Sequence, residues 1–420
     1  MTTTTSPAVP AGDGALRLRY LAEVSALLWP EPVRAGLGVA GGSVLSEFVL
    51  VPDAKRPRLL VPAGHRRAAA AAVRRYTEPG SVKQRLLLRT LSAALATGLG
   101  GVAMRQRFRV CTDHGGGPVG TIETYLRAAL DPDLVVSLAI GPARANRKPV
   151  LQLLTPDGAT IGFAKLGVND LTRALTRAER DSLRTVHGSA LRHLTVPEVL
   201  HHGQWNGLEV LVLTPLPVWE PRVERSPERL AAAMLEIATI GGVTEGPLRG
   251  SPYWTALGDR LGALADGEPM RALRRAYAGI EEHAGDIRLR YGAWHGDWTP
   301  WNMATLRETL LVWDWERFAT GVPLGFDAVH YAFQGAVVRQ GADPLAAVTE
   351  TVDRAAELLA PFAAPGAMSA GARLTALLYF ADIAIRYLRD EQAEAGARLG
   401  KLGQWLLPVL IDQVERLHVD

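Results

Sequence analysis

The first half of the chain alternates short apolar runs with turn residues, a pattern that predicts strands. Runs at 134–140, 149–154 and 160–166 are joined by tight turns such as Thr-Pro-Asp-Gly at 155–158, which predicts an antiparallel meander. Asn169-Asp170 then supplies the cap of an amphipathic helix that we expect to run to about His187. Two more strands are expected at 197–202 and 208–213, so the predicted order is three strands, one helix and two strands.

Beyond Pro215 and Pro217 the apolar positions follow a helical period instead. Ser226-Pro227 is a typical helix start. Further helices are predicted at 252–283, 326–339, 344–359, 370–394 and 399–419. The exception is the segment 294–315, where a polar loop precedes a short apolar run at 310–313, and we expect the chemistry of the protein to lie there.

The N-terminal part predicts a tail and a separate module. Residues 1–14 lack periodicity, which indicates a disordered tail. Val-rich runs at 46–51 and 58–61 and a helical stretch from Gly64 predict a small α/β accessory module. The triplet Gly115-Gly116-Gly117 is a strong break signal. We therefore expect an accessory module at 15–117, a sheet-rich unit at 118–214 and a helical unit at 215–420.

Composition and charge narrow the range of partners and locations. Hydrophobic residues make up 48% of the chain and charged residues 21%, which is typical of globular proteins. The net charge of +3 gives little reason to expect a polyanion, and the basic residues between Lys55 and Arg89 favour a solvated helix face over nucleic-acid binding. Cys111 is the single cysteine, and the longest apolar stretch, 91–104, is too short to span a bilayer. We expect a cytoplasmic protein without nucleic-acid or membrane partners.

The loop at 294–302 combines residue types that suit phosphoryl transfer. Asp297 precedes Asn302 by five positions, and Asp314 follows twelve positions later. Asn302 and Asp314 offer hard oxygen ligands for a metal ion that bridges phosphates, while Asp297 would face the acceptor hydroxyl. An aspartate with an ordinary pKa near ~3.9 is a weak base at neutral pH, so its main task would be to orient that hydroxyl.

The pattern His-x-Asp-x-x-x-x-Asn, followed at this distance by Trp-Asp-Trp-Glu, resembles the aminoglycoside phosphotransferase and protein-kinase-like superfamily. The resemblance covers about residues 134–417, and His-Gly-Asp is more similar to the small-molecule branch than to protein kinases. It implies an α+β, two-lobed protein-kinase-like fold, with a small antiparallel-sheet lobe and a larger helical lobe, to which the N-terminal module is added. It also implies Asp297 as catalytic base, Asn302 and Asp314 as magnesium ligands and Glu316 as an auxiliary acid.

Residues upstream of this loop fit the same resemblance. Lys165 lies in the third predicted strand, as a lysine that holds the α- and β-phosphates would, and Glu179 falls in the next helix, where it would pair with Lys165. Leu213 and Thr214 follow in the hinge that would receive adenine. The loop at 141–148 has one glycine where such kinases have several, so Arg144 or Lys148 would supply charge instead. ATP and Mg²⁺ are the expected cofactors, and GTP stays open.

Several of these residues have simpler interpretations. Thr176-x-x-Glu179 matches a capping box, which would make Glu179 a helix-start residue. The alternative for Lys165 is a snorkelling residue of an edge strand. Asp327 is expected to cap the helix that follows Gly325-Phe326. Asp382 has two interpretations, an intrahelical ion pair with Arg386 or a wall of the acceptor pocket.

Three functions follow from these observations. The first is an ATP- and magnesium-dependent phosphotransferase that acts on a hydroxyl of a small molecule such as a sugar, aminosugar, antibiotic or other metabolite. The second is a kinase that phosphorylates Ser or Thr of a peptide in a modified-peptide biosynthetic pathway. The third, suggested by the glycine-poor phosphate loop, is a non-catalytic pseudokinase or scaffold.

Overall fold

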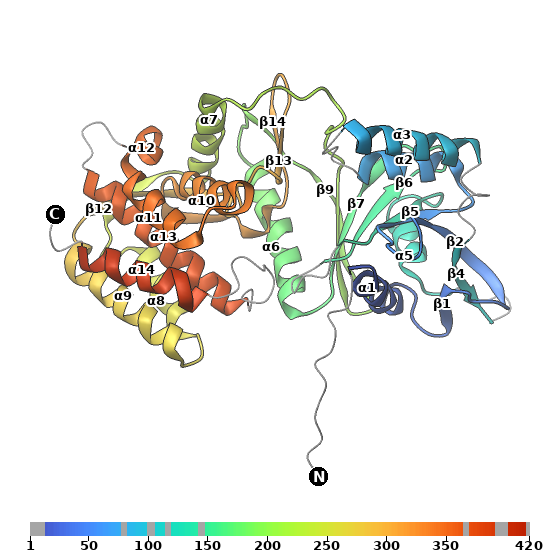
Figure 1. Ribbon diagram of the computed structural model, residues 1–420, viewed down its shortest axis with the longest axis horizontal. Coiled ribbons are helices and arrows are strands. Elements are labelled where there is room, and N and C mark those ends of the chain that lie inside the picture. The colour runs from blue at the N-terminus through green and yellow to red at the C-terminus, as the bar shows by residue number, and fades with distance from the viewer. Residues whose placement is uncertain are drawn as a thin grey trace, which may run out of the picture. The chain divides into compact units, whose positions relative to one another are not determined.

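The computed structural model describes residues 13–76, 82–98, 106–113, 119–141, 148–363, 369–390 and 402–416. The chain forms two compact units, Met1–Thr176 with Val199–Pro215, and Arg177–Glu198 with Leu216–Asp420. The first unit is built on one large sheet and the second mainly on helices (Figure 1). The predicted α+β class is therefore confirmed. The Gly115-Gly116-Gly117 break and most of the predicted tail lie outside the described residues.

The first unit contains a nine-stranded sheet in which every pair of neighbours is antiparallel. Its order is β1-β4-β2-β3-β5-β6-β7-β10-β9. The strands are β1 Val33–Leu37, β2 Ser43–Val51, β3 Leu59–Pro62, β4 Arg107–Thr112, β5 Val135–Ala139, β6 Val150–Leu154, β7 Thr160–Gly167, β9 Val199–Trp205 and β10 Leu208–Leu213. The predicted meander is present as β5, β6 and β7. The pairing of β3 with β5 joins the strands of the N-terminal segment to this meander in one continuous sheet.

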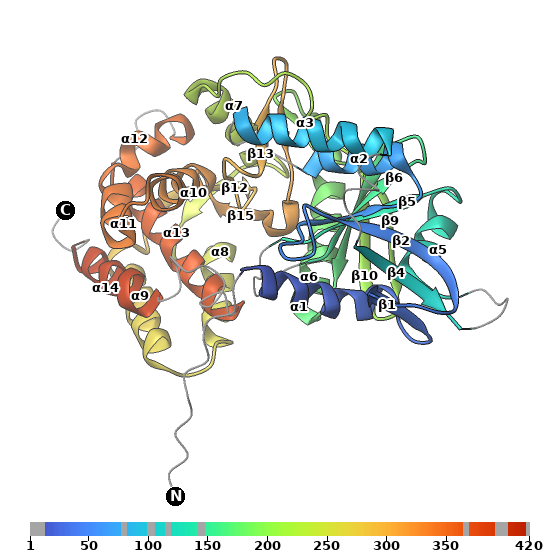
Figure 2. The same ribbon diagram turned by 45° about the vertical axis from the view of Figure 1, so that its right-hand side comes forward.

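Both faces of this sheet carry apolar side chains, because alternate residues of a strand point to opposite faces. Val49, Val51 and Val61 pack with the alanine-rich helix α2 on one face. Phe48 and Leu50 pack with α1 and α5 on the other. The helices are α1 Asp13–Leu28, α2 Arg66–Tyr76, α3 Val82–Thr97 and α5 Ile122–Ala129. Helices α2 and α3 lie side by side (Figure 2), and the buried hydroxyl of Ser92 donates to the carbonyl of Ala70 at 3.0 Å.

Helix α6, Asp170–His187, begins where the sequence predicts. The side-chain oxygen of Asn169 accepts a hydrogen bond from the Thr172 N–H at 2.8 Å, which satisfies one of the unpaired donors at the helix start. The Thr176 hydroxyl instead donates back to the Thr172 carbonyl at 2.8 Å, inside the helix. The capping box at Thr176 and Glu179 is therefore wrong, and Glu179 is a mid-helix residue that is completely buried.

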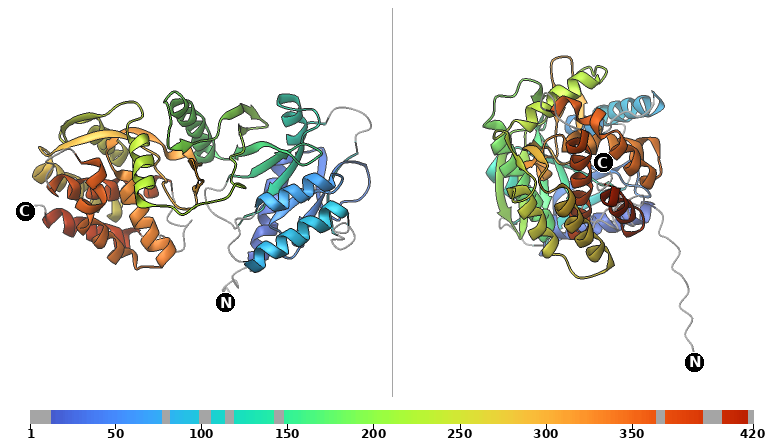
Figure 3. Two further views of the ribbon diagram at one scale, coloured as in Figure 1. Left: turned by 90° about the horizontal axis from the view of Figure 1, so that it is seen from above. Right: turned by 90° about the vertical axis from the view of Figure 1, so that its left-hand side faces the viewer.

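The second unit is built around helices. They are α7 Pro227–Ala238, α8 Pro252–Gly262, α9 Glu268–Ala284, α10 Phe326–Gln334, α11 Pro344–Asp353, α12 Ala355–Leu359, α13 Ser369–Arg389 and α14 Leu402–Glu415. The single helix predicted at 252–283 is wrong, because the chain leaves the helix before Gly267, whose backbone is extended. The helix predicted at 344–359 is likewise two helices, and that at 326–339 continues from α10 as a π-helix, Gly335–Gln340. Helices α11, α13 and α14, coloured orange to red, pack together (Figure 3).

Two small sheets in this unit hold the segment at 294–315. Their strands are β8 Leu194–Thr195, β11 Thr244–Pro247, β12 Arg288–Trp294, β13 Met303–Thr305, β14 Leu310–Val312 and β15 Ala319–Pro323. The orders are β11-β12-β15 and β13-β14-β8. Only β14 was predicted from the sequence, and the loop between β12 and β13 is thus attached to a different sheet at each end. In the described parts of the chain, no helix has the length and apolar character needed to cross a membrane.

Candidate active site

The loop that follows β12 is held in place by hydrogen bonds to Asp327 and Arg386. The carboxylate of Asp327, in the first turn of α10, accepts hydrogen bonds from the backbone N–H groups of His295 at 2.7 Å and Gly296 at 3.1 Å. Arg386 of α13 donates to the Gly296 carbonyl at 2.7 Å. Gly296 has a φ of +82°, and a Cβ there would collide with the carbonyl oxygen of Arg317. The middle position of His-Gly-Asp therefore requires glycine.

The predicted role of Asp327 as a helix cap is wrong. The residue that caps α10 is Gly325, without a side-chain hydrogen bond, while Asp327 turns its carboxylate to the loop at 295–296. Burial raises the pKa of Asp327 to about 7, against the opposing effect of the two backbone N–H donors. Asp327 is thus a structural residue, as expected, but the structure it supports is the candidate active-site loop.

Asp297 and Asn302 are in direct contact within this loop. The Asn302 amide donates to Oδ2 of Asp297 at 2.7 Å and to the Asp297 carbonyl at 3.0 Å. Asn302 is almost completely buried, whereas the side chain of Asp297 keeps 35% of its surface exposed. Because the Asn302 amide nitrogen is used by Asp297, its Oδ1 is the atom that can face a metal ion.

Asp314 follows Trp313, whose backbone is hydrogen-bonded to Asn302. The Trp313 N–H donates to the Asn302 carbonyl at 3.1 Å, which ties the strand end to the loop. Asp314 has a φ of +72°, a left-handed conformation that aspartate tolerates better than most residues. The charge of Asp314 also acts on Asp297 and His295. The three residues predicted from the motif, Asp297, Asn302 and Asp314, are therefore gathered in one place.

The neutral ring of His295 connects the loop to the end of β14 through two hydrogen bonds. Burial lowers its pKa to about 4, although the charges of Asp297 and Asp314 oppose this effect. The neutral ring accepts from the Asp297 N–H through Nδ1 at 3.2 Å, so that Nε2–H donates to the Trp313 carbonyl at 3.2 Å. Both contacts use the same tautomer, which fixes the spacing between the loop and Asp314.

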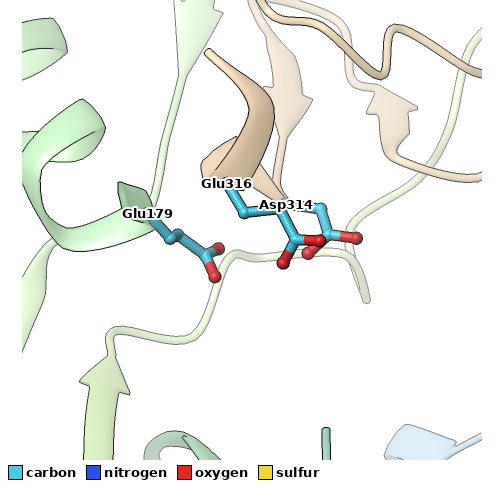
Figure 4. A group of neighbouring side chains, drawn as sticks. All are labelled: Glu179, Asp314 and Glu316. Atoms are coloured by element: carbon cyan, nitrogen blue, oxygen red, sulfur yellow. The ribbon is translucent and has the colours of Figure 1, made fainter. Parts of the chain in front are cut away.

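Asp314 belongs to a cluster of three carboxylates. One carboxylate oxygen each of Glu179, Asp314 and Glu316 lies within 4.8 Å of the other two, and Figure 4 shows the three groups turned toward one another. Glu179 comes from α6, and Glu316 from the short 3₁₀ helix Trp315–Arg317. Like charges this close repel unless a cation lies among them, and hard oxygen donors suit a divalent cation. The sequence predicted Glu179 only as a partner of Lys165 and missed its proximity to Asp314.

Lys165, Leu213 and Thr214 lie in the sheet unit. Lys165 is half-buried on β7, an interior strand between β6 and β10, so the interpretation as an edge-strand lysine is wrong. Lys165 and Glu179 belong to different units, and their pairing stays a prediction. Leu213 ends β10 and Thr214 follows it, while their role toward adenine also stays a prediction. Arg144 lies outside the described residues.

The structure also corrects the interpretation of Asp382. Its carboxylate receives both terminal nitrogens of Arg260, at 3.0 and 2.8 Å, and the Tyr253 hydroxyl at 3.4 Å. Arg386, its expected partner, is directed to the Gly296 carbonyl and lies over the ring of Trp294. The predicted intrahelical pair is wrong because Arg260 of α8 forms a bidentate pair with Asp382 instead.

His330 and Tyr379 were missed by the sequence reasoning. His330 Nε2 lies 3.2 Å from Oδ1 of Asp297, and its Nδ1 lies 2.9 Å from the Tyr379 hydroxyl. Each residue occupies an apolar helix, α10 and α13, at a position that the periodicity assigns to the core. No local signal marks them, since both contacts join segments far apart in the sequence.

Comparisons with known proteins gave structural matches alone, since no protein-family model and no curated protein matches the chain. One match is a thermostable mutant of the aminoglycoside phosphotransferase APH(4)-Ia with AMP-PNP and hygromycin B, at TM-score 0.45 and 15% identity, over 70% of this chain and 98% of that chain. Amicoumacin kinase hAmiN, with AMP-PNP, Ca²⁺ and Ami, matches at TM-score 0.42 and 9% identity, over 69% and 93%. A choline/ethanolamine kinase family protein from Mesorhizobium loti matches at TM-score 0.39 and 16% identity, over 67% and 93%.

All three matches are kinases or phosphotransferases by name, the class of protein that the His-x-Asp-x-x-x-x-Asn motif resembles. Their TM-scores are below 0.5, and the function proposed below rests on the residues of this chain.

Proposed function

We propose that this protein is an ATP- and magnesium-dependent phosphotransferase, a kinase that moves the γ-phosphate of ATP to a hydroxyl of a small molecule. A sugar, aminosugar, antibiotic or other metabolite is the proposed acceptor. The observation that carries the proposal is the contact of Asn302 with Asp297, at 2.7 Å, in a buried loop tied by its backbone to Asp314. Phosphoryl transfer needs a carboxylate for the acceptor and oxygen ligands for the metal at this short range.

Asp297 is assigned the acceptor hydroxyl because 35% of its side-chain surface is exposed, whereas its partner Asn302 is almost completely buried. Burial by itself would raise its pKa, but the hydrogen bond from His330 opposes this, and the pKa lies below the ordinary value of 3.8. The carboxylate is therefore ionised at neutral pH and can accept a hydrogen bond from the hydroxyl. Its contribution is to orient the nucleophile, and the proton moves late in the transfer.

Asn302 and Asp314 are assigned the magnesium ion, with Glu316 as an auxiliary ligand. These residues fit the ion because they offer hard oxygen atoms, and because Glu179, Asp314 and Glu316 concentrate negative charge that a divalent cation would offset. When bound, magnesium supplies charge neutralisation for the β- and γ-phosphates. Asn302 and Asp314 would hold the ion near Asp297.

The nucleotide itself is assigned to the sheet unit. Lys165 would hold the α- and β-phosphates, Leu213 and Thr214 would receive adenine, and Arg144 would add positive charge near the phosphates. GTP is the alternative nucleotide. The intact Asp297, Asn302 and Asp314 argue against a pseudokinase, and no observation on the described residues favours a peptide acceptor.

The proposal is tested by thermal-shift titration with ATP and GTP, each with and without magnesium. A ligand that binds only the native state raises its stability, by about 2.7 kcal/mol at 100 times its Kd. A metal-dependent shift with one nucleotide is expected, followed by ADP or GDP release when a panel of sugars, aminosugars and aminoglycosides is added. Absence of any metal-dependent shift and of any nucleotide turnover would contradict the proposal.

A further inference from the structure

A buried chain of polar groups ends on Asp297, the proposed catalytic residue. His330 of α10 is 2% exposed and Tyr379 of α13 is completely buried. Tyr379 contacts Nδ1 of His330 at 2.9 Å, and Nε2 of the same ring contacts Oδ1 of Asp297 at 3.2 Å. Burying polar groups costs free energy unless they are paired, and the hydrogen bonds among these three residues provide that pairing.

The direction of both hydrogen bonds follows from elementary chemistry. An ionised carboxylate can only accept, so Nε2–H of His330 donates to Asp297. In the tautomer with its proton on Nε2, Nδ1 carries a lone pair, which accepts from the Tyr379 hydroxyl. Burial raises the pKa of Tyr379 well above its ordinary value, so this hydroxyl keeps its proton. Tyr379 therefore donates to His330, and His330 donates to Asp297. One tautomer of His330 satisfies all three groups.

Asp297 is therefore held at both carboxylate oxygens. Asn302 donates to Oδ2 at 2.7 Å and His330 to Oδ1 at 3.2 Å, and these two contacts together fix the plane of the carboxylate. Each oxygen has a second lone-pair direction, so an acceptor hydroxyl can still bind. The exposed 35% of the Asp297 side chain is the part open to that hydroxyl, while its orientation is set from the buried side.

We propose that His330 is a positioning residue for phosphoryl transfer, oriented by Tyr379, which holds Asp297 in the geometry that the acceptor hydroxyl requires. This inference rests on the proposed function. Its physical basis is that a displacement of about 1 Å of a reacting group costs roughly 100-fold in rate. A purely structural His330 would instead serve only to fill the space between α10 and α13.

Substitutions that keep or remove the N–H donor of His330 distinguish a positioning role from a purely structural one. His330→Gln places an amide N–H near the position of Nε2, whereas His330→Leu fills the space without a donor. Tyr379→Phe removes the hydroxyl that orients the ring. Tyr253→Phe is the matched control, because Tyr253 is also a buried tyrosine of this unit and its hydroxyl contacts Asp382 rather than His330.

The kinetic test uses magnesium-ATP with water as acceptor, followed by ADP release. We expect His330→Leu to lower kcat roughly 100-fold with KM for ATP nearly unchanged, His330→Gln to keep most of the rate, and Tyr379→Phe to lose roughly tenfold. Tyr253→Phe should behave as the parent protein. Equal losses in the Gln and Leu variants, or full kcat in His330→Leu, would overturn the proposal.

A second measurement does not depend on turnover. In protein labelled with ¹⁵N-histidine, NMR should show His330 as the Nε2–H tautomer. Asp297→Ala should shift its Nε2 resonance, and Tyr379→Phe its Nδ1 resonance. An Nδ1–H tautomer would overturn the inference. A protein with the predicted NMR signature that neither binds nor turns over magnesium-ATP would refute the proposed function, which keeps the two failures distinct.

Discussion

We expect the hydrogen bonds between Asp327 and the loop at 295–296 to stabilise the folded protein. Replacing Asp327 with Ala removes the acceptor of two backbone N–H groups, those of His295 and Gly296, at 2.7 and 3.1 Å. Both residues are buried, so water does not replace the lost acceptor without opening the loop. Each buried donor left unpaired costs about 1–3 kcal/mol, which gives about 2–6 kcal/mol for the pair.

That loss is a large part of the stability of an ordinary protein, which is about 5–15 kcal/mol. Asp327→Asn is therefore the more informative variant, because its single carbonyl oxygen can accept one of the two bonds and the expected loss falls to about 1–3 kcal/mol. Asp343→Ala is the control. Asp343 caps α11 with one exposed hydrogen bond to the Ala346 N–H, and its removal should cost only about 1 kcal/mol.

The assay is hydrogen exchange measured by mass spectrometry on peptides covering 288–302, with urea unfolding followed in parallel. About 1.4 kcal/mol corresponds to a tenfold change, so Asp327→Asn should speed exchange in this segment roughly 5- to 150-fold. Asp343→Ala should leave the segment unchanged. Unaltered exchange at 295–296 in Asp327→Asn would refute the anchoring role.

The remaining predictions concern pH, metal and nucleotide. Because the pKa of Asp327 is raised from 3.8 to about 7, its contribution to stability is fully present below about pH 4 and is lost as the pH rises through 7. In urea unfolding, the difference in stability between the parent protein and Asp327→Asn should therefore shrink from pH 5 to pH 8. A constant difference would contradict this prediction. Asp314→Asn should abolish the magnesium-dependent part of the thermal shift with ATP, and an unchanged metal dependence would remove Asp314 from the proposed site. Lys165→Ala should raise KM for ATP or lower kcat roughly tenfold or more, and unchanged kinetics would refute its role toward the phosphates.

Local signals in the sequence predicted the elements that depend on them. The Asn169 cap and the amphipathic pattern after it predicted α6 with its bounds, and turn residues between β-rich runs predicted the meander of β5, β6 and β7. The spacing of Asp297, Asn302 and Asp314 predicted residues that the structure places together, because a short loop and a hairpin connect them directly.

Contacts between distant segments were beyond the same reasoning. Helices α10 and α13 carry Asp327 and Arg386, which hold the loop, and also His330 and Tyr379. The periodicity of these helices indicates only that the residues are buried. Strand β12 was missed, and its pairing with β11 and β15 joins segments that are distant in sequence. Asp382 was given the neighbour one turn away, whereas α8 supplies a better bidentate partner.

The most direct test of the central claim is the turnover of magnesium-ATP by Asp297→Asn, measured as ADP release with the best acceptor of the panel and with water. The substitution keeps the size of the side chain, so thermal shift should show nucleotide binding close to that of the parent protein. Transfer should fall roughly 10²- to 10⁴-fold, because the hydroxyl loses the carboxylate that orients it and receives its proton. Full turnover by Asp297→Asn, with binding intact, would contradict the assignment of this loop as the active site.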